Sequence, residues 1–295
     1  MKKVFLLIIS GIIIYSCQKE PSSNTPPIVT RDDSTTLLMY IDLDTTQAAG
    51  LDTLNIQKYS YDNSKRLMKS AYIEYESGMP AHFSITNLYY NGTDTLPFKK
   101  TETNYDSPGG TAGLSDTAYY IYNGDKIISD SVRSGYNSFP VVGKYAYDNN
   151  KVTETRLDYS LTPPAYPYSH EVYLTKINGN TTLQMDTTFL DGVLSSSTRF
   201  SFVYDVKINP FYNIPQPFVE RSFPYYDGET YSEEMVYEKN NPTDINETGD
   251  PFGTGAFHFK YFYEYKSNGY PSVARVYDQD DPSNFYKRIF IYTKL

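Results

Sequence analysis

The sequence predicts an all-β protein, and three observations support this fold class. The chain has 32 Tyr and 16 Phe but no Trp, and aromatic side chains, like Val, Ile and Thr, suit the pleated surface of a sheet. After residue 37, apolar and polar residues alternate, with no sustained helical period of 3.6 residues. Turn motifs recur between the alternating runs. We expect a long twisted antiparallel meander of hairpin repeats with about 14 to 18 strands, either open or curled into a partly closed barrel.

The first sixteen residues predict a signal peptide. Two lysines precede an apolar stretch at residues 4–15, which is too short to span a bilayer as a stable helix. The segment Ile14-Tyr15-Ser16-Cys17 resembles a bacterial lipobox. That resemblance implies cleavage before Cys17, acylation of its thiol and anchoring to a membrane. An ordinary secreted protein with a stray cysteine is the alternative.

Residues 17–36 predict a lipidated N-terminus followed by a flexible linker. Gln18-Lys19-Glu20 resembles the Lys-acidic signal that follows the lipidated cysteine in surface-exposed lipoproteins of Bacteroidota. The rest of the segment is rich in Pro, Ser, Thr and Asn, which is typical of a linker. We therefore expect a signal peptide at 1–16, a tether at 17–36 and a single all-β repeat domain at 37–295. The expected location is the outer membrane, with the domain exposed on the cell surface.

The acidic charge and the single cysteine exclude several kinds of partner and site. The formal net charge is -9, and removal of residues 1–16, which contain two lysines, makes it -11. Nucleic-acid binding needs clustered Lys and Arg, so no nucleic-acid partner is expected. Anionic lipid is also a poor partner, so attachment depends on the lipid on Cys17. With one cysteine, the chain can form no intramolecular disulfide and no zinc-thiolate cluster.

Pairs of aromatic residues two positions apart recur before turn motifs along the predicted domain. Tyr59-Ser60-Tyr61-Asp62-Asn63-Ser64-Lys65-Arg66-Leu67 is similar to the Tyr-Asp repeat Tyr-x-Tyr-Asp-x-x-Gly-Arg-Leu, with Lys65 in place of the glycine. Asn, Asp and Gly in the turns accept the left-handed backbone that tight hairpins need. Similar turns are expected at Tyr122-Asn123-Gly124-Asp125-Lys126, Tyr147-Asp148-Asn149-Asn150-Lys151 and Tyr265-Lys266-Ser267-Asn268-Gly269.

Two further segments narrow the resemblance. Phe202-Val203-Tyr204-Asp205 and the closing Tyr263-Glu264-Tyr265-Lys266-Ser267-Asn268-Gly269-Tyr270-Pro271 resemble the β-repeat domain of uncharacterised Bacteroidota lipoproteins. The resemblance covers most of residues 37–295. It implies a fold and a location but no activity. The repeats are few and unevenly spaced, so the hollow shells that long regular arrays build in toxin-delivery proteins are not expected.

The sequence predicts no catalytic site, no metal site and no cofactor. His82, His170 and His258 are scattered without metal-ligand spacing, and His258 is expected on a strand facing solvent. The chain has no Gly-x-Ser-x-Gly elbow, no phosphate-binding Gly loop and no His-Glu-x-x-His. Asp278-Gln279-Asp280-Asp281 is acidic enough for calcium, but a solvated turn is favoured because the longer ligand pattern is missing.

Loop aromatics are the predicted binding residues. Tyr faces can stack on sugars and anchor interfaces, but strand tyrosines are first needed to stabilise neighbouring strands. Four tyrosines lie in Pro-interrupted segments that we expect to be loops, and these are the candidate binding residues: Tyr166, Tyr168, Tyr225 and Tyr226.

A second motif predicts covalent modification. Asp followed by Ser or Thr and then a small or aliphatic residue, or Thr, resembles the O-glycosylation motif of exported Bacteroidota proteins. The candidate residues are Ser34, Thr45, Thr53, Thr95, Thr117, Ser131 and Thr187. Repeated turns in which Asp closes one hairpin and Thr opens the next strand would give the same triplets without modification.

The function expected from these features is a non-enzymatic surface module that binds a glycan or a protein, or assembles with one. A structural envelope lipoprotein without a small ligand and an unrecognised hydrolase are the alternatives. The mature chain is too polar, and its alternating runs are too short and interrupted, for a membrane-spanning barrel.

Overall fold

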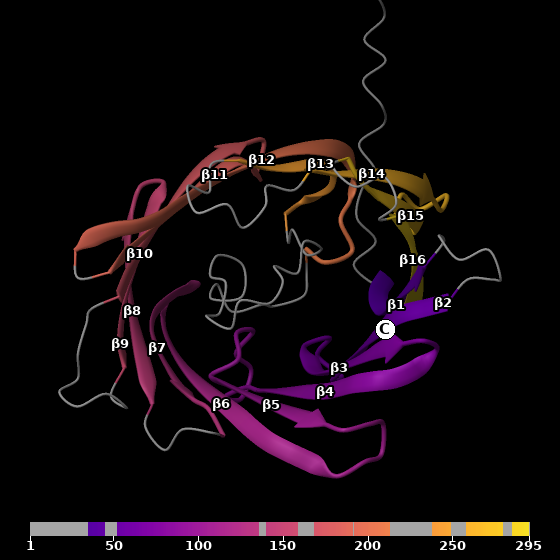
Figure 1. Ribbon diagram of the computed structural model, residues 1–295, viewed down its shortest axis with the longest axis horizontal. Helices are drawn as coiled ribbons and strands as arrows, with labels where there is room; N and C mark the ends of the chain where they lie inside the picture. Colours follow the sequence, from indigo (N-terminus) through magenta and orange to yellow (C-terminus); the bar gives the residue numbers. More distant parts are fainter. Residues whose placement is uncertain are drawn as a thin grey trace, which may run out of the picture. The chain divides into compact units, whose positions relative to one another are not determined.

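The computed structural model describes residues 35–44, 52–135, 140–158, 168–190, 192–212, 238–248, 258–279 and 285–294. Within these residues the fold is all-β, and its strands follow one another around a ring (Figure 1). All of the strands lie in the compact unit Arg31–Leu295. The predicted fold class is confirmed, and the first strand begins two residues before the expected start of the domain at residue 37.

The strands are β1 (Thr35–Asp44), β2 (Asp52–Tyr61), β3 (Leu67–Glu76), β4 (Met79–Tyr89), β5 (Lys99–Tyr105), β6 (Ala112–Asn123), β7 (Lys126–Arg133), β8 (Val141–Asp148), β9 (Lys151–Asp158), β10 (Tyr168–Ile177), β11 (Asn180–Leu190), β12 (Val193–Ile208), β13 (Asn240–Thr248), β14 (His258–Tyr265), β15 (Pro271–Asp278) and β16 (Phe285–Lys294). Each strand pairs antiparallel with its neighbours in the sequence, and β1 also pairs with β16. The sheet is therefore a closed barrel, where the sequence allowed only an open sheet or partial closure.

The first and last strands are joined by a buried ion pair as well as by backbone pairing. Arg288 on β16 donates from Nε and Nη2 to the two carboxylate oxygens of Asp42 on β1, at 2.7 and 2.6 Å. Both side chains are almost fully buried, and the guanidinium lies 4.2 Å from the ring centre of Tyr40. The bidentate geometry satisfies both charges, which offsets much of the cost of removing them from water.

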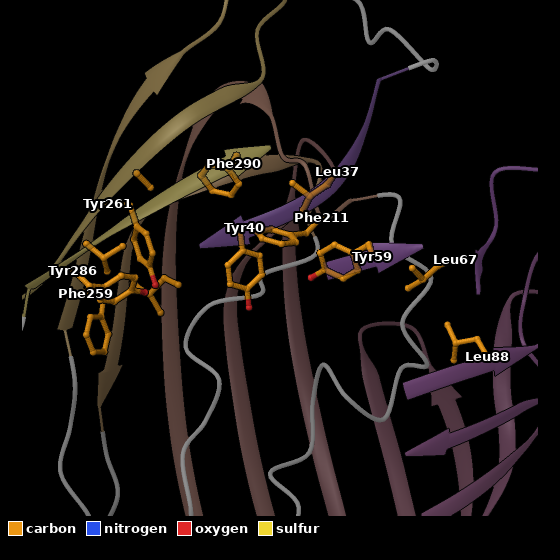
Figure 2. Close-up of a cluster of buried hydrophobic side chains, with 13 residues drawn as sticks. Leu37, Tyr40, Tyr59, Leu67, Leu88, Phe211, Phe259, Tyr261, Tyr286 and Phe290 are labelled. Atoms are coloured by element: carbon orange, nitrogen blue, oxygen red, sulfur yellow. The ribbon is translucent and has the colours of Figure 1, made fainter. Parts of the chain in front are cut away.

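Contacts across the barrel identify its inner face. Phe211, just after β12, packs edge-on against Tyr40 at 5.8 Å and near Phe290 at 6.1 Å between ring centres (Figure 2). In the sheet β12 is separated from β16 by β13, β14 and β15, so this contact lies on the concave side. Tyr40 and Phe290 thus point inward, and alternation along each strand with the observed register assigns the other residues.

Inward-facing apolar side chains form two clusters on the inner wall. The larger cluster spans β13 to β16 and β1 to β4 and includes Tyr59, Leu88, Tyr261 and Tyr286 (Figure 2). The smaller spans β6 to β10 and comprises Ala118, Tyr120, Ile127, Tyr145, Val152 and Val172. The first aromatic of a Tyr-x-Tyr unit, as at Tyr59, Tyr120 and Tyr145, therefore belongs to the core.

The second tyrosine of the unit forms a hydrogen bond to the neighbouring strand at one end of the barrel, and other tyrosines at that end form the same bond. Its hydroxyl, near the end of an even-numbered strand, donates to a backbone carbonyl near the start of the preceding strand. Six such bonds, each of 2.7 or 2.8 Å, join Tyr61 to Leu37, Tyr90 to Leu67, Tyr122 to Pro97, Tyr147 to Ile127, Tyr204 to Thr181 and Tyr292 to Pro271. We call these residues the rim tyrosines. Burial raises the pKa of Tyr90 and of Tyr147 to about 12.

Cations from the turns cover three rim tyrosines. The guanidinium of Arg66 lies 4.7 Å from the ring centre of Tyr90. In the same way, Lys126 lies 4.9 Å from Tyr147, and Lys266 lies 4.6 Å from Tyr292. Cation–π attraction adds to the hydrogen bond, so the basic residue that follows each turn motif helps to hold the next hairpin.

The turns predicted between the aromatic pairs are confirmed. Gly124 and Asn149 occupy two-residue hairpin turns with φ of 65° and 48°, as left-handed turn positions require. Lys65, which stands where the Tyr-Asp repeat has glycine, also has a positive φ of 62°. The turn keeps its shape there because Asp62 accepts bonds from the backbone N–H groups of Ser64 and Arg66 at 2.9 Å.

Candidate functional site

A polar surface occupies the inner wall of β2 to β5. Asp42 points inward, and residues directly opposite one another on paired strands point the same way. Asn55, Glu74 and His82 follow Asp42 in register, so they also point inward. A second row of inward side chains, next to this one, begins at Tyr40. We call the inward side chains of these four strands the inner polar face: Asn55, Gln57, Ser70, Tyr72, Glu74, His82, Ser84, Thr86, Lys100, Glu102 and Asn104.

Most of these side chains are half-exposed, and Glu74 and Asn104 are exposed. Among the residues that the structure describes, several of them contact no hydrogen-bonding or charged partner through their side chains: Asn55, Gln57, Glu74, His82 and Asn104. Asn55 Oδ1 is shielded from solvent as well. Nζ of Lys100 lies 3.5 Å from Oε2 of Glu102. The face therefore presents amide and carboxylate groups that form no side-chain hydrogen bond or ion pair with the described residues.

Another arc of the inner wall, on β7 to β9, carries polar groups that do hold the fold together. The Tyr145 hydroxyl on β8 lies 2.9 Å from Asp130 Oδ2 on β7 and 3.0 Å from Glu154 Oε1 on β9. Arg156 pairs with Glu154 through Nε, and its Nη2 lies 3.6 Å from Asp130 Oδ2. The backbone N–H of Gly143 donates to Asp130 Oδ1 at 2.9 Å. These groups brace neighbouring strands across the wall.

Burial shifts the pKa of several groups in this arc. It raises the pKa of Glu154, partly against the Arg156 charge, and raises that of Tyr145. Burial, helped by Arg156, lowers the pKa of His170 to about 4, so this imidazole is neutral at pH 7. Burial also raises the pKa of Asp186 to about 7, with Glu247 adding to the rise and a 3.0 Å bond from Gln184 opposing it.

A third polar group lies where β12 meets β13. Asp205 accepts hydrogen bonds from the Tyr265 hydroxyl and from the Asn241 side chain. Asn241 also lines a cavity of about 10 Å³ together with Phe211, Tyr261 and Arg288. That volume holds about one water molecule, so the cavity is too small for an organic ligand.

The outer wall carries charged side chains on several strands. Lys144, Arg199, Lys260, Arg275 and Lys287 each follow an inward residue and point outward. Outward ion pairs join Arg275 Nη2 to Glu264 Oε1 at 2.6 Å and His258 Nε2 to Asp244 Oδ1 at 3.0 Å. Apolar side chains also point outward: Ile41, Ile56 and Ile73 occupy one row on β1 to β3, and Ile121, Ile128, Val203 and Phe262 are exposed on other strands.

Most of the predicted binding tyrosines lie outside the described residues. Tyr166, Tyr225 and Tyr226 fall there, as do Cys17 and the linker up to residue 34. Tyr168 is the exception, and its assignment to a loop was wrong. It is the first residue of β10 and pairs with Leu190 and Arg156 on the two neighbouring strands, because backbone pairing on both sides extends the strand to this position.

The candidate glycosylation residues divide by position. Ser34 and Thr45 lie outside the described part of the chain. Thr53 is on β2 opposite Leu43. The strand residues Thr117, Ser131 and Thr187 face outward, whereas the aspartates before them face inward, and Asp130 and Asp186 are buried. Thr95, by contrast, lies with Asp94 in an exposed segment between β4 and β5. It is the described candidate whose whole motif is accessible in the folded domain.

The three histidines do not come together. His82 lies on the inner polar face, His170 is buried beside Glu154, and His258 starts β14 on the outer wall, as predicted for His258. No group of three or more metal-ligating side chains occurs among the described residues. The part of the chain with assigned structure also contains no helix that is long and apolar enough to cross a membrane. In the acidic segment Asp278-Gln279-Asp280-Asp281, Asp278 is the last residue of β15, and Asp280 and Asp281 lie outside the described residues.

Sequence reasoning missed the inner polar face altogether. Its members carry no motif, since their spacing along the chain is only the period of a strand. They become neighbours through the register of four strands. The one available signal was the alternation of polar residues in β2 to β5, as in Asn55-Ile56-Gln57 and Tyr72-Ile73-Glu74, which marks one face as polar without saying that it is the inner one.

Comparison with known proteins supports the barrel fold. No protein-family model and no curated protein matches the chain, so the resemblance to the repeat family remains an expectation. A porin-like protein from Bacteroides uniformis matches with a TM-score of 0.50 and 11% identity, covering 88% of this chain and 97% of its own. A porin-like protein from Bacteroides vulgatus matches with a TM-score of 0.42 and 13% identity, over 88% of this chain and 100% of its own. The first likeness shows a shared fold.

Proposed function

We propose that this chain is a lipid-anchored, non-enzymatic β-barrel of the outer membrane that stands at the cell surface and binds, or assembles with, a glycan or a protein. The leader and Ile14-Tyr15-Ser16-Cys17 support the anchor. The barrel fold, and the name porin-like carried by a Bacteroides protein with the same fold, support a place in the outer membrane. The uncommitted side chains of the inner polar face support a binding role.

One observation carries the proposal, namely the charge on the outer wall. A barrel that spans the outer membrane presents an apolar band to lipid, and Lys or Arg at the bilayer midplane costs about 2–4 kcal/mol each. Here Lys144, Arg199 and Arg275 are exposed on the outer wall. On β8, β12 and β15, where these three residues lie, the wall favours contact with water over contact with lipid. The acyl chains on Cys17 then provide the attachment that the barrel itself does not.

Maleimide labelling tests this arrangement. The chain has one cysteine, and acylation at Cys17 blocks its thiol, so a single introduced cysteine reports its own surroundings. We expect Lys144→Cys, Lys260→Cys and Arg275→Cys to react with a membrane-impermeant maleimide on intact cells. Asp125→Cys, in the exposed turn between β6 and β7, is the control for access to that rim.

The outcomes separate the parts of the proposal. Labelling of all four variants supports a water-facing wall at the cell surface. Labelling only after the cells are permeabilised keeps the water-facing wall and removes surface exposure. If Asp125→Cys reacts while the three wall variants stay protected until detergent is added, the barrel spans the membrane and the proposal is wrong.

The braced carboxylates give little support to the hydrolase alternative. Asp130 and Glu154 are a close pair, as in many glycosidases, but both are fully buried and held by Tyr145 and Arg156. A general acid or base must reach substrate. Their geometry fits bracing of the wall better than proton transfer.

A further inference from the structure

We infer that the inner polar face is a binding site for a short, neutral glycan. This inference rests on the binding role proposed above and gives that role a place and a ligand class. The face lies on β2 to β5, on strands rather than on the Pro-rich loops, and a glycan chain there would run along the inner wall of the barrel.

The first argument is the contrast between the two arcs of the inner wall. On β7 to β9, Asp130, Tyr145 and Glu154 are buried and bonded to one another. At the β1–β16 seam, Asp42 and Arg288 are paired in the same way. On β2 to β5 the polar side chains of Gln57, Glu74, His82 and Asn104 reach solvent and contact no such partner in the described chain. Within the described residues these groups do not brace the strands, so their hydrogen-bonding capacity is available to a ligand.

Asn55 adds a second, independent observation. Its Oδ1 has lost contact with solvent but accepts no hydrogen bond from any described residue. An amide oxygen left in this state costs roughly 1–3 kcal/mol, and buried polar atoms in folded proteins are nearly always satisfied. A hydroxyl group on the inner polar face supplies the missing donor if the side chains that cover Asn55 Oδ1 move aside to admit it. Asn55 is next to Glu74 in register, so the same hydroxyl could be shared by both.

The chemistry of the face fits sugar hydroxyls. Amides such as Gln57 and Asn104 both donate and accept, and carboxylates such as Glu74 accept from two adjacent hydroxyls. Tyr72, directly opposite Gln57 on β3, brings an aromatic ring to the middle of the face, where it can pack against the apolar side of a pyranose.

Charge selects against acidic ligands. Two carboxylates, Glu74 and Glu102, face a single ammonium group, that of Lys100, on the inner polar face. The mature chain is itself strongly acidic. Uronic acids, sulfated sugars and nucleic acids would be repelled. A neutral oligosaccharide avoids this repulsion, whereas a cationic peptide would exploit it, so the peptide is the competitor that the experiment must separate.

Calorimetric titration of the purified lipoprotein in detergent tests the inference. The neutral probes are hexasaccharides of glucose in α- and β-linkage, of xylose, of mannose and of N-acetylglucosamine. A hexamer of galacturonic acid and a hexalysine peptide are the charged probes. We expect at least one neutral hexasaccharide to bind and both charged probes to bind more weakly.

Matched variants locate the site. Tyr72→Ala and Asn104→Ala alter the inner polar face and should each weaken binding by about tenfold or more, as loss of a stacking or hydrogen-bonding contact to a ligand predicts. Tyr75→Ala and Asn87→Ala alter the same residue types on the outer faces of β3 and β4 and should change affinity by less than about twofold. Unfolding midpoints of all four variants show whether a loss of binding is a loss of folding.

The results decide between the possibilities. Binding of a neutral probe that falls with the inner variants and not with the outer ones supports the inference. Binding that survives both inner variants in folded protein overturns it, as does binding of hexalysine alone or of no probe at all. A chain that binds no sugar but is cross-linked to a partner protein on cells keeps the proposed binding role and loses the glycan. A chain that does neither loses both.

Discussion

At the scale of single residues, the inner wall contains two buried groups that respond to pH in opposite directions. His170 has its pKa lowered to about 4 by burial and by Arg156, so the folded state resists its protonation. Asp186 has its pKa raised to about 7, mainly by burial, so the folded state resists its ionisation. In register, Val172 lies between them, opposite Asp186 and two residues from His170.

Substitution of Asp186 should therefore alter the pH dependence of stability. The folded state keeps the Asp186 proton up to about pH 7, whereas an unfolded carboxyl releases it near its usual 3.8. The stabilising contribution is complete at low pH and is lost as pH rises through that window. As pH rises from 5 to 8, we expect the free energy of unfolding of Asp186→Asn minus that of wild type to increase by about 2–3 kcal/mol. Urea unfolding at each pH measures this difference.

His170→Gln provides the opposite sign. Since the folded-state pKa of His170 lies below the usual 6.5, its contribution is present above pH 6.5 and is lost as pH falls toward 4. As pH falls from 6.5 toward 4, the free energy of unfolding of His170→Gln should therefore rise relative to that of wild type, as urea unfolding would measure. For the Asp186 prediction, the contradicting result is a free energy of unfolding that changes with pH in the same way in wild type and Asp186→Asn. That result would show that Asp186 is already ionised in the folded protein at pH 5 as well as at pH 8.

At the scale of elements, the Tyr-x-Tyr unit combines two different tasks in three residues. The first aromatic fills the core, as Tyr145 does, and the second closes the rim, as Tyr147 does through its bond to Ile127. Two inward positions in succession on one strand produce this pair. The repeat joins each hairpin to the one before it, which accounts for the tyrosines of these units without a ligand.

Removal of one rim hydroxyl should weaken the barrel measurably. Tyr147→Phe keeps the ring under Lys126 and removes only the bond to the Ile127 carbonyl, so we expect a loss of about 1 kcal/mol in the free energy of unfolding. Tyr147→Ala also removes the ring and should cost more. Tyr119→Phe, which loses an outward and exposed hydroxyl, should leave the urea midpoint unchanged. Equal midpoints for Tyr147→Phe and Tyr119→Phe would contradict a role for the rim bonds.

Prediction from sequence succeeded where a structural feature is local. The turns at Gly124 and Asn149 were predictable because the conformation depends on one or two residues. The inner polar face was not, because strand bulges reverse the alternation: register shifts occur between Leu37 and Met39 and between Ser60 and Tyr61. One such bulge exchanges inward and outward positions, so polar alternation alone cannot say which face lines the barrel.

At the scale of the whole molecule, the anchor and the barrel are expected to act separately. Cys17→Ala should release the protein from the outer membrane or leave an uncleaved precursor, while the unfolding midpoint of the barrel stays as in wild type, because Cys17 lies outside the compact unit Arg31–Leu295. Membrane fractionation and N-terminal sequencing measure both results. A cleaved Cys17→Ala protein that still sediments with membranes would mean that something other than acylation holds it there.

Closure through β1 and β16 also sets an order on folding. The Asp42–Arg288 contact joins residues 246 positions apart, so the seam cannot form until β16 is available. Every other strand pair in the barrel joins neighbours in the sequence and can form as the chain emerges. Until then β1, which contains Met39, Ile41 and Leu43, has one unpaired edge. Such an edge can pair with a strand of another chain. A polypeptide cut short before β16 should therefore be prone to aggregation, and pairing of β16 with β1 is the step that ends the risk.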